Sequence, residues 1–229
     1  MKTIGVLGGM GPQATMDFEW RLHRAAQRAI PPSANRGYPP MVVYYVRHPP
    51  AILEADRKPR MPLAPDPRML EAARRLGGLA DFLVIPSNFT HVFQPQIEHA
   101  AGRDVLSMVD LVPGELRARR WTRVGVVGVG LPIVYTDRLD AIDVTHETLA
   151  PEHRAALDAS ILSVMEGRET DASRSVAHEA ITTLRGRGVD GTILGCTEIP
   201  LLLGAAAESP DLLNPLELLA HAAVARAIA

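Results

Sequence analysis

The stretch LGGLADFLVIPSN (76–88) and a later counterpart, RGRGVDGTILGCT (185–197), decide the expected fold. In each, a glycine-rich turn and an aspartate lead into a short apolar run, which ends at a small polar residue, Ser87 or Cys196. The aspartate precedes that residue by six positions in both stretches. Short apolar runs bounded by turn residues are typical of buried strands. We therefore expect two equivalent strands whose carboxyl ends carry Ser87 and Cys196.

The rest of the chain supports a repeat. TIGVLGG (3–9) corresponds to RVGVVGV (123–129), and longer Ala-, Leu- and Arg-rich segments separate the apolar runs. Alternating helices and near-continuous apolar strands are typical of parallel sheets covered on both faces. We predict an α/β fold with two pseudo-symmetric lobes, each a mostly parallel sheet flanked by helices. The first lobe would comprise residues 1–109 and 206–229, and the second would comprise residues 110–205.

The expected elements follow from these patterns. Strands are predicted at 3–9, 40–46, 81–86, 123–129 and 191–196; helices are predicted at 12–30, 67–76, after the run 105–112, within 151–188 and at 213–228. Ten of the nineteen prolines lie between residues 31 and 67, which excludes regular helix from most of that stretch. Its second half, Arg47 to Pro67, is interpreted as a long loop of the kind that often forms a lid.

Composition excludes several classes of function. The 24 basic and 26 acidic residues balance, so no charge pattern favours nucleic acid or an anionic membrane as a partner. Aromatic residues make up 4% of the chain, too few for a base-stacking surface. A single cysteine excludes an intrachain disulfide and a multi-cysteine metal cluster. Without a recognisable signal peptide or an apolar run of about 18 residues, we expect a cytoplasmic protein.

The first motif is GGMGPQAT (8–15), between a strand and a helix. Glycines let a backbone approach a ligand closely, and a helix start offers N–H groups to an anion. We interpret Gly9, Met10 and Gly11 as a carboxylate-binding turn. The motif also fits a dinucleotide fingerprint, but Pro12 removes an N–H group and no acidic residue ends the second strand. A glycine turn required only for packing is the remaining alternative.

The second motif is IPSNFTH (85–91). Ser87 lies just past a strand, where its side chain can project into a cleft, and Asn88 can donate to a carboxylate. A serine becomes nucleophilic only with a base in reach, and His91 is the nearest candidate. The motif lacks the G-x-S-x-G elbow of hydrolases. An ordinary capping Ser-Asn pair is an equally good interpretation.

The third motif is LGCTEIP (194–200). Cys196 precedes an expected helix start, whose N–H groups and dipole would lower the thiol pKa toward neutrality and make a thiolate base feasible. Glu198 would stabilise the first helical turn or orient the thiol or a substrate amine. Alternatively, Cys196 is only a small residue of the hydrophobic core.

Together the three motifs resemble those of the aspartate/glutamate racemase superfamily, within it the aspartate racemase branch, whose pattern is GGMGP-E-AT, then I-P-C-N-T-A-H, then G-C-T-E. The resemblance spans the whole chain. It implies two pseudo-symmetric lobes with the active site in the cleft between them, no pyridoxal phosphate, no metal and a homodimer. It also implies a pair of cysteines that exchange protons on opposite faces of one carbon.

Several residues depart from this pattern. Ser87 replaces the first family cysteine, by natural divergence or by an engineered change, and a serine cannot exchange protons with a carbon acid as a thiol does. Phe89 replaces a threonine. The Asp–Arg pair expected after the second strand is out of register: Arg47 and His48 stand there, and Asp56–Arg57 come later. Two further changes are Gly130–Leu131–Pro132 in place of a threonine-rich turn and Met165 in place of a basic residue. Each change makes the expected pocket less polar.

We expect an enzyme that transfers a proton at a carbon alpha to a carboxylate, acting on a small carboxylate or amino-acid substrate. It would be a cofactor-independent racemase or epimerase, with Cys196 as acid and base and Ser87 opposite it. The expected substrate contacts are Gly9, Met10, Gly11, Arg47, Asn88, Phe89, Thr90, Thr197 and Glu198, with Arg47 gripping a carboxylate through two hydrogen bonds or serving only as a solvated loop residue. A one-cysteine decarboxylase or isomerase of a less polar substrate, a non-catalytic ligand-binding homologue and a dinucleotide-dependent enzyme are the alternatives.

Overall fold

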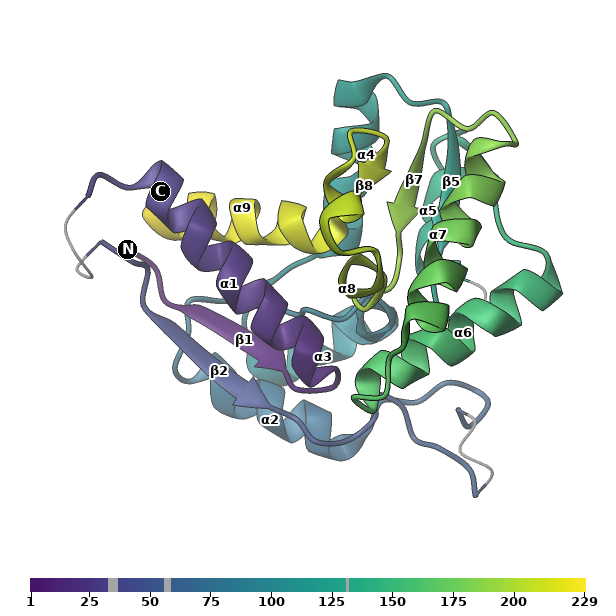
Figure 1. Ribbon diagram of the computed structural model, residues 1–229. Coiled ribbons are helices and arrows are strands. Elements are labelled where there is room, and N and C mark those ends of the chain that lie inside the picture. Colours follow the sequence, from purple (N-terminus) through teal and green to yellow (C-terminus); the bar gives the residue numbers. More distant parts are fainter. Residues whose placement is uncertain (33–36, 56–58, 131) are drawn as a thin grey trace. The chain divides into compact units, whose positions relative to one another are not determined.

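The computed structural model describes residues 1–32, 37–55, 59–130 and 132–229 (Figure 1). The chain forms two compact units: Met1–Met108 with Leu216–Ala229, and Val109–Pro215. Residues 206–215, which are predicted to belong to the first lobe, lie in the second unit. The reason is that strand β8 (Leu212–Leu213) pairs with β7 (Gly191–Leu194) of that unit.

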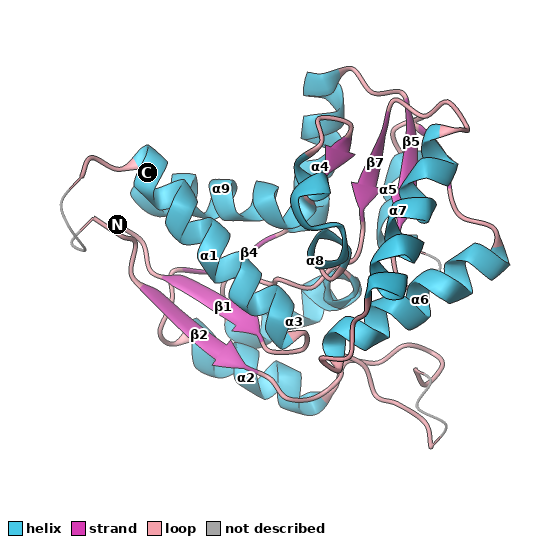
Figure 2. Ribbon diagram, in the orientation of Figure 1, coloured by secondary structure: helices cyan, strands magenta, loops and turns pink. Residues whose placement is uncertain are grey.

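The first unit contains a four-stranded parallel sheet with the strand order β2-β1-β3-β4 (Figure 2). Its strands are β1 (Ile4–Gly8), β2 (Met41–Tyr45), β3 (Phe82–Val84) and β4 (Val105–Leu106). Its helices are α1 (Pro12–Ala29), α2 (Pro67–Gly77), the 3-10 helix η1 (Phe89–Phe93), α3 (Gln94–Ala101) and α9 (Pro215–Ile228). Figure 1 shows α1 and α2 on opposite sides of this sheet.

Local sequence explains where these helices begin. Pro12 and Pro67 occupy the first turns of α1 and α2, where a missing N–H group costs nothing. The side chain of Asp66 caps α2 by accepting a hydrogen bond from the Arg68 backbone N–H at 2.8 Å. Between α1 and α9, the buried side chain of Arg21 forms an ion pair with Glu217 at 2.5 Å.

The second unit repeats the arrangement, with the strand order β6-β5-β7-β8. Its strands are β5 (Arg123–Val127), β6 (Thr145–Glu147), β7 and β8, all parallel. Its helices are α4 (Met108–Arg119), α5 (Ile133–Asp140), α6 (Pro151–Met165), α7 (Asp171–Arg185), the short α8 (Ile199–Leu203) and the 3-10 helix η2 (Gly204–Glu208). Thr170 and Ser173 form a reciprocal capping box at the start of α7.

The internal repeat predicted from the sequence is confirmed by the matching strand orders. It also explains the repeated aspartate. Asp81, before β3, accepts a hydrogen bond from the Thr3 N–H at 2.6 Å and donates its own N–H to the Thr3 carbonyl oxygen. Asp190, before β7, makes the same reciprocal pair with Arg123, at 2.9 Å and 2.7 Å. Each aspartate therefore joins the starts of the first and third strands of its unit.

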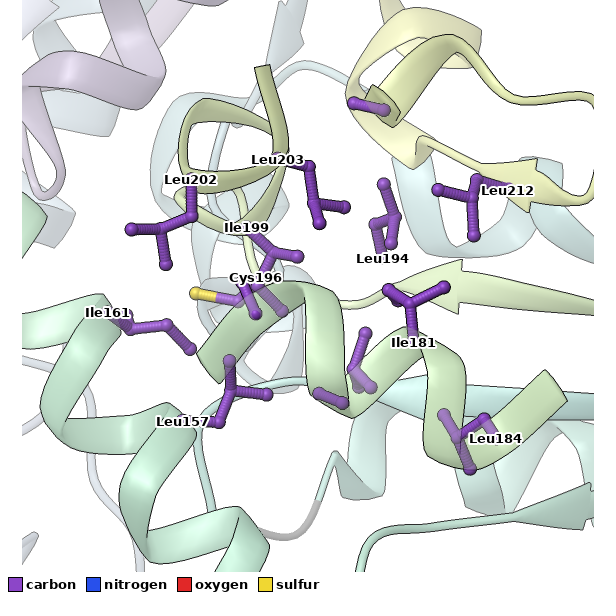
Figure 3. Packing of buried hydrophobic residues seen from close by; sticks show 14 of the residues in the cluster. Leu157, Ile161, Ile181, Leu184, Leu194, Cys196, Ile199, Leu202, Leu203 and Leu212 are labelled. Carbon is purple, nitrogen blue, oxygen red and sulfur yellow. The ribbon is translucent and has the colours of Figure 1, made fainter. Parts of the chain in front are cut away.

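Each unit has its own hydrophobic core. In the first unit, buried residues of the sheet pack with those of α2 and α3, including Leu83 and Met69. In the second, residues of β7 pack with those of α6, α7 and α8. Cys196 belongs to this second cluster, and Figure 3 shows its sulfur directed away from Leu194 and Leu212.

Some elements carry too little sequence pattern to be predicted. Helix α3 has eight residues and begins with Pro95 in its first turn, so its helical periodicity is short. Strands β6 and β8 have three and two residues, too few for a recognisable strand pattern. Within 47–67, the described residues form isolated bridges, Ala51–Pro65 and Leu53–Pro59. The role of this segment as a lid stays a prediction.

None of the helices in the described part of the chain is both long and apolar enough to span a membrane. Within the same residues, no group of three or more His, Cys, Asp and Glu side chains is placed to hold a metal ion.

Candidate active site

The first two motifs lie at the carboxyl edge of the first sheet. Strand β1 ends at Gly8 and β3 ends at Val84, and these two strands are parallel neighbours. The segments that follow them therefore leave the sheet at the same edge, where ligands bind in open α/β sheets. One contact joins them directly, because the Thr90 hydroxyl lies 3.5 Å from the Met10 sulfur.

The turn after β1 is built around Gly9. Its φ of +82° lies in the left-handed region, and a Cβ there would come within 2.6 Å of the Tyr45 Cα. The Gly9 N–H donates to the Thr15 hydroxyl at 2.8 Å, and that hydroxyl donates to the Gly11 carbonyl oxygen at 3.1 Å. The Gly9 hydrogen is therefore used inside the turn, and the carboxylate-binding role expected of Gly9, Met10 and Gly11 stays a prediction.

Ser87 is half-buried just past β3. Its hydroxyl oxygen accepts a hydrogen bond from the Thr90 hydroxyl at 2.8 Å. His91 does not meet that hydroxyl through Nδ1, which lies 2.9 Å from the Ser87 carbonyl oxygen instead. This contact orders the turn, and it gives no support to a serine nucleophile activated by His91.

The neighbours of Ser87 are largely packed into the unit. Asn88 and Thr90 are buried at the start of η1. Phe89 is half-buried and meets Phe93 edge-to-face, with 6.0 Å between ring centroids. Phe89 therefore contributes to the core, and its expected contact with a substrate stays a prediction.

The third motif follows β7 in the second unit. Gly195 allows a close approach: a Cβ at this position would lie 2.8 Å from the Val127 carbonyl oxygen and 3.2 Å from the Tyr135 ring. Cys196 comes next and is 7% exposed. Its thiol donates to Glu198 Oε2 at 3.0 Å, and the Thr197 hydroxyl donates to the same oxygen at 2.9 Å. Thr197 therefore uses its proton on Glu198, and the three residues form one hydrogen-bonded group.

The expected lowering of the thiol pKa is wrong. Burial raises the pKa of Cys196 well above its usual value, and the carboxylates of Glu198 and Asp158 raise it further. The backbone N–H of Glu198 acts in the opposite direction but does not prevail. Helix α8 has five residues, so its dipole is weak. At neutral pH the resting side chain is a thiol hydrogen-bonded to a carboxylate, which is a proton donor in its ground state.

Two residues near Cys196 are not identified by the sequence motifs. Tyr135 is fully buried against Gly195, and burial raises the pKa of its phenol well above the ordinary value. Asp158, on α6, accepts a hydrogen bond from the Gly130 N–H at 2.9 Å. Neither stands in a motif, and both reach the site only through the packing of α5 and α6. No sequence pattern would have found them.

Arg47 is exposed beyond the end of β2. Its guanidinium stacks on the Tyr45 ring, 4.8 Å from the centroid. It lines a hollow of the first unit, and its expected grip on a substrate carboxylate stays a prediction. Asp56, Arg57 and Leu131, which depart from the family pattern, lie outside the described residues.

Two α/β units with the same parallel strand order, each carrying a motif residue beyond the end of its third strand, define the class of two-lobed racemase folds. The sequence model of the family described as Asp/Glu/Hydantoin racemase matches residues 7–223, and the chain belongs to that family. Enzymes of this family are cofactor-independent racemases and isomerases, and this chain is therefore an enzyme of that type.

Solved structures share this fold. Aspartate racemase from Picrophilus torridus matches with a TM-score of 0.81 and 20% identity, covering 99% of this chain and 94% of that one. An aspartate racemase homologue from Pyrococcus horikoshii OT3 matches with a TM-score of 0.74 and 18% identity over 100% of both chains. Glutamate racemase from Francisella tularensis, solved with D-glutamate, matches with a TM-score of 0.62 and 15% identity, covering 98% of this chain and 80% of that one.

Proposed function

We propose that this enzyme transfers a proton at the carbon alpha to a carboxylate of a small amino acid or related acid, with Cys196 as the proton carrier and Glu198 as its partner. The observation that carries the proposal is the hydrogen bond of 3.0 Å between the Cys196 sulfur and Glu198 Oε2 at the carboxyl end of β7. Family membership supplies the reaction class, and the D-glutamate bound to the Francisella relative supports a small carboxylate as substrate.

The chemistry follows from the state of the thiol. To remove an alpha proton, Cys196 must first lose its own proton, and Glu198 is the acceptor already in hydrogen-bond contact. The sulfur then takes the proton from carbon, and the electron pair of the C–H bond moves into the substrate carboxylate as an enolate. In the reverse direction the thiol delivers its proton to the enolate carbon, and Glu198 returns its proton to sulfur.

Ser87 occupies the equivalent position in the repeat of the first unit. An alcohol cannot return a proton to carbon at a useful rate, because its pKa lies far above that of a thiol. We therefore infer a one-base enzyme that protonates a single face of its intermediate. The donors assigned to the carboxylate and enolate oxygens are the Met10 and Gly11 turn, Asn88 and Thr90.

A second function is favoured by the neutral thiol. Loss of carbon dioxide from a disubstituted malonate generates the enolate without any base, and only a proton donor is then needed. A buried thiol with a raised pKa suits that step better than it suits deprotonation. Phe89 in place of a threonine is consistent with a less polar substrate. We also infer, from the family resemblance, a homodimer in the cytoplasm, and sedimentation analysis of the purified protein would test the dimer.

Solvent exchange separates these functions. The enzyme is incubated in D₂O with aspartate, glutamate and less polar amino acids, and deuterium at Cα is followed by NMR; a parallel assay measures carbon dioxide released from alkyl- and arylmalonates. Proton exchange at Cα predicts label in the recovered amino acid, whereas decarboxylation predicts label only in the acid that remains after the malonate loses carbon dioxide. Cys196→Ser keeps the size of the side chain and should abolish either signal. Turnover that survives in this variant would exclude Cys196 as the proton carrier.

A further inference from the structure

A hollow of about 540 Å³ lies in the first unit, beside the carboxyl end of β2. Its volume falls in the range of small-molecule sites, about 300 to 1,000 Å³. It is lined by Tyr44–His48 from the end of β2 and by Pro67, Arg68, Glu71 and Arg75 from α2. Figure 1 shows α2 running beside β2, so one strand end and one helix face form the walls.

The lining is rich in guanidinium groups. Arg68, Glu71 and Arg75 follow one face of α2 at helical spacing. Glu71 is the single carboxylate in the lining and is shared, because Arg75 Nε donates to its Oε1 at 2.9 Å and Arg74 bonds its Oε2. Asp66 neutralises Arg68 through two hydrogen bonds. The lining thus has three arginines and one carboxylate, and with the adjoining Arg74 and Asp66 counted, four arginines stand against two carboxylates, which leaves an excess of positive charge.

Arg47 provides the unpaired charge. Among the described residues it makes no ion pair with a carboxylate, and its guanidinium carbon lies over the Tyr45 ring, 4.8 Å from the centroid. A guanidinium over an aromatic face keeps N–H groups available for hydrogen bonds to a ligand. Arg75, in the same lining, is held in turn by its ion pair with Glu71.

We propose that this hollow is a binding site for a small organic phosphate that takes no part in the proton transfer. One guanidinium group can donate two parallel hydrogen bonds to phosphate oxygens. A phosphate dianion has enough acceptor oxygens to bind both Arg47 and Arg75. A monocarboxylate would satisfy only one of them. The hollow is larger than a lone phosphate ion requires, so the remainder would hold the organic part against Tyr44 and Pro67.

A ligand bound in the hollow can affect the turn around Gly9 through backbone contacts. The Tyr45 Cα and Val46 N lie against Gly9, so closely that a Cβ on Gly9 would be 2.6 Å and 2.7 Å from them. Val46 N–H also donates to the Gly8 carbonyl oxygen at 2.8 Å. A ligand that orders Tyr45–Arg47 would therefore also order the Gly9 turn, which makes the site suited to an effector.

Calorimetric titration of the full chain with pyrophosphate tests the proposal. We expect saturable binding that Arg47→Gln and Arg75→Gln each weaken about tenfold, the loss expected for one charge-assisted hydrogen bond. Arg74→Gln is the matched control, because Arg74 pairs with the same Glu71 but does not line the hollow; its affinity should stay within about twofold of wild type. Glu71→Gln should bind several times more tightly, a gain that misfolding cannot produce.

Three results would overturn the proposal. Equal weakening by Arg74→Gln and Arg75→Gln would mean diffuse attraction to a basic surface. Citrate binding as tightly as pyrophosphate would assign the hollow to carboxylates. Loss of pyrophosphate binding in Cys196→Ala would make it part of the substrate site. Because binding is measured without turnover, this test stands or falls independently of the proposed proton transfer.

Discussion

Glu198→Gln separates the two roles that a carboxylate beside a thiol can have. The amide has the size of the carboxylate but carries no charge and cannot accept the thiol proton. If Glu198 is the acceptor through which Cys196 becomes a base, exchange of the substrate alpha proton should fall by roughly 10²- to 10⁴-fold, the usual contribution of a positioned base. If Glu198 only packs against the thiol, exchange should hardly change.

The structure also sets the expected cost in stability. Glu198 accepts two hydrogen bonds, from Cys196 and Thr197. Exchanging a charged acceptor for a neutral one weakens each by about 1 kcal/mol. Removing a buried charge offsets much of this, since Glu198 is 2% exposed. The free energy of unfolding should therefore change by less than about 2 kcal/mol, so a loss of activity could not be attributed to unfolding.

Glu198→Gln should make the Cys196 thiol easier to ionise even though it slows exchange of the substrate proton. Because the Glu198 carboxylate helps to raise the pKa of Cys196, the neutral amide should lower it relative to wild type. Alkylation by iodoacetamide should then begin at lower pH in Glu198→Gln, while exchange, followed by NMR in D₂O, is slower. A variant that keeps wild-type exchange, or whose alkylation profile moves to higher pH, would refute this account of the pair.

Three further predictions concern the scaffold and the first unit. Arg185 and Ser209 hold the pKa of Asp211 to about 2, below the ordinary value of 3.8, so the contribution of Asp211 to stability is present above pH 3.8 and is lost as pH falls toward 2. Asp211→Asn should therefore cost about 1 kcal/mol in urea unfolding at pH 7, allowing for its partly exposed side chain, and the difference should shrink in acid; a constant difference would contradict the assignment. Gly9→Ala should cost about 3 kcal/mol or more, from strain at positive φ and overlap with the Tyr45 backbone; a change below about 1 kcal/mol in the same assay would show that the turn relaxes. Ser87→Cys should raise the rate of interconversion of enantiomers, relative to the rate of one-face exchange, at least about tenfold, as measured by chiral chromatography; an unchanged ratio of these rates would show that residue 87 does not face the reacting carbon.

The sequence predicts the elements whose patterns are local and strong. The apolar runs at β1, β3, β5 and β7, bounded by glycine and aspartate, are sufficient to indicate two equivalent sheets. The repeated aspartate has a definite role in both sheets, the reciprocal pairing of strand starts. Such features can be recognised because each depends on a few consecutive residues.

The site is harder to predict because its chemistry depends on side-chain orientation. The sequence predicts that a helix acidifies Cys196, but α8 is about one turn long and the Glu198 side chain folds back onto the sulfur. It also places Gly9 in a carboxylate-binding turn, but it does not indicate that Thr15, six residues later, accepts the Gly9 hydrogen. Tyr135 enters through the packing of α5 against Gly195 and leaves no sequence pattern.

The most direct test of the central claim is the stereochemistry of labelling in D₂O. A single thiol that carries every proton to and from carbon predicts deuterium delivered to one face only, at a rate that vanishes in Cys196→Ser. Deuterium arriving equally on both faces, or uptake unchanged after loss of the sulfur, would contradict it.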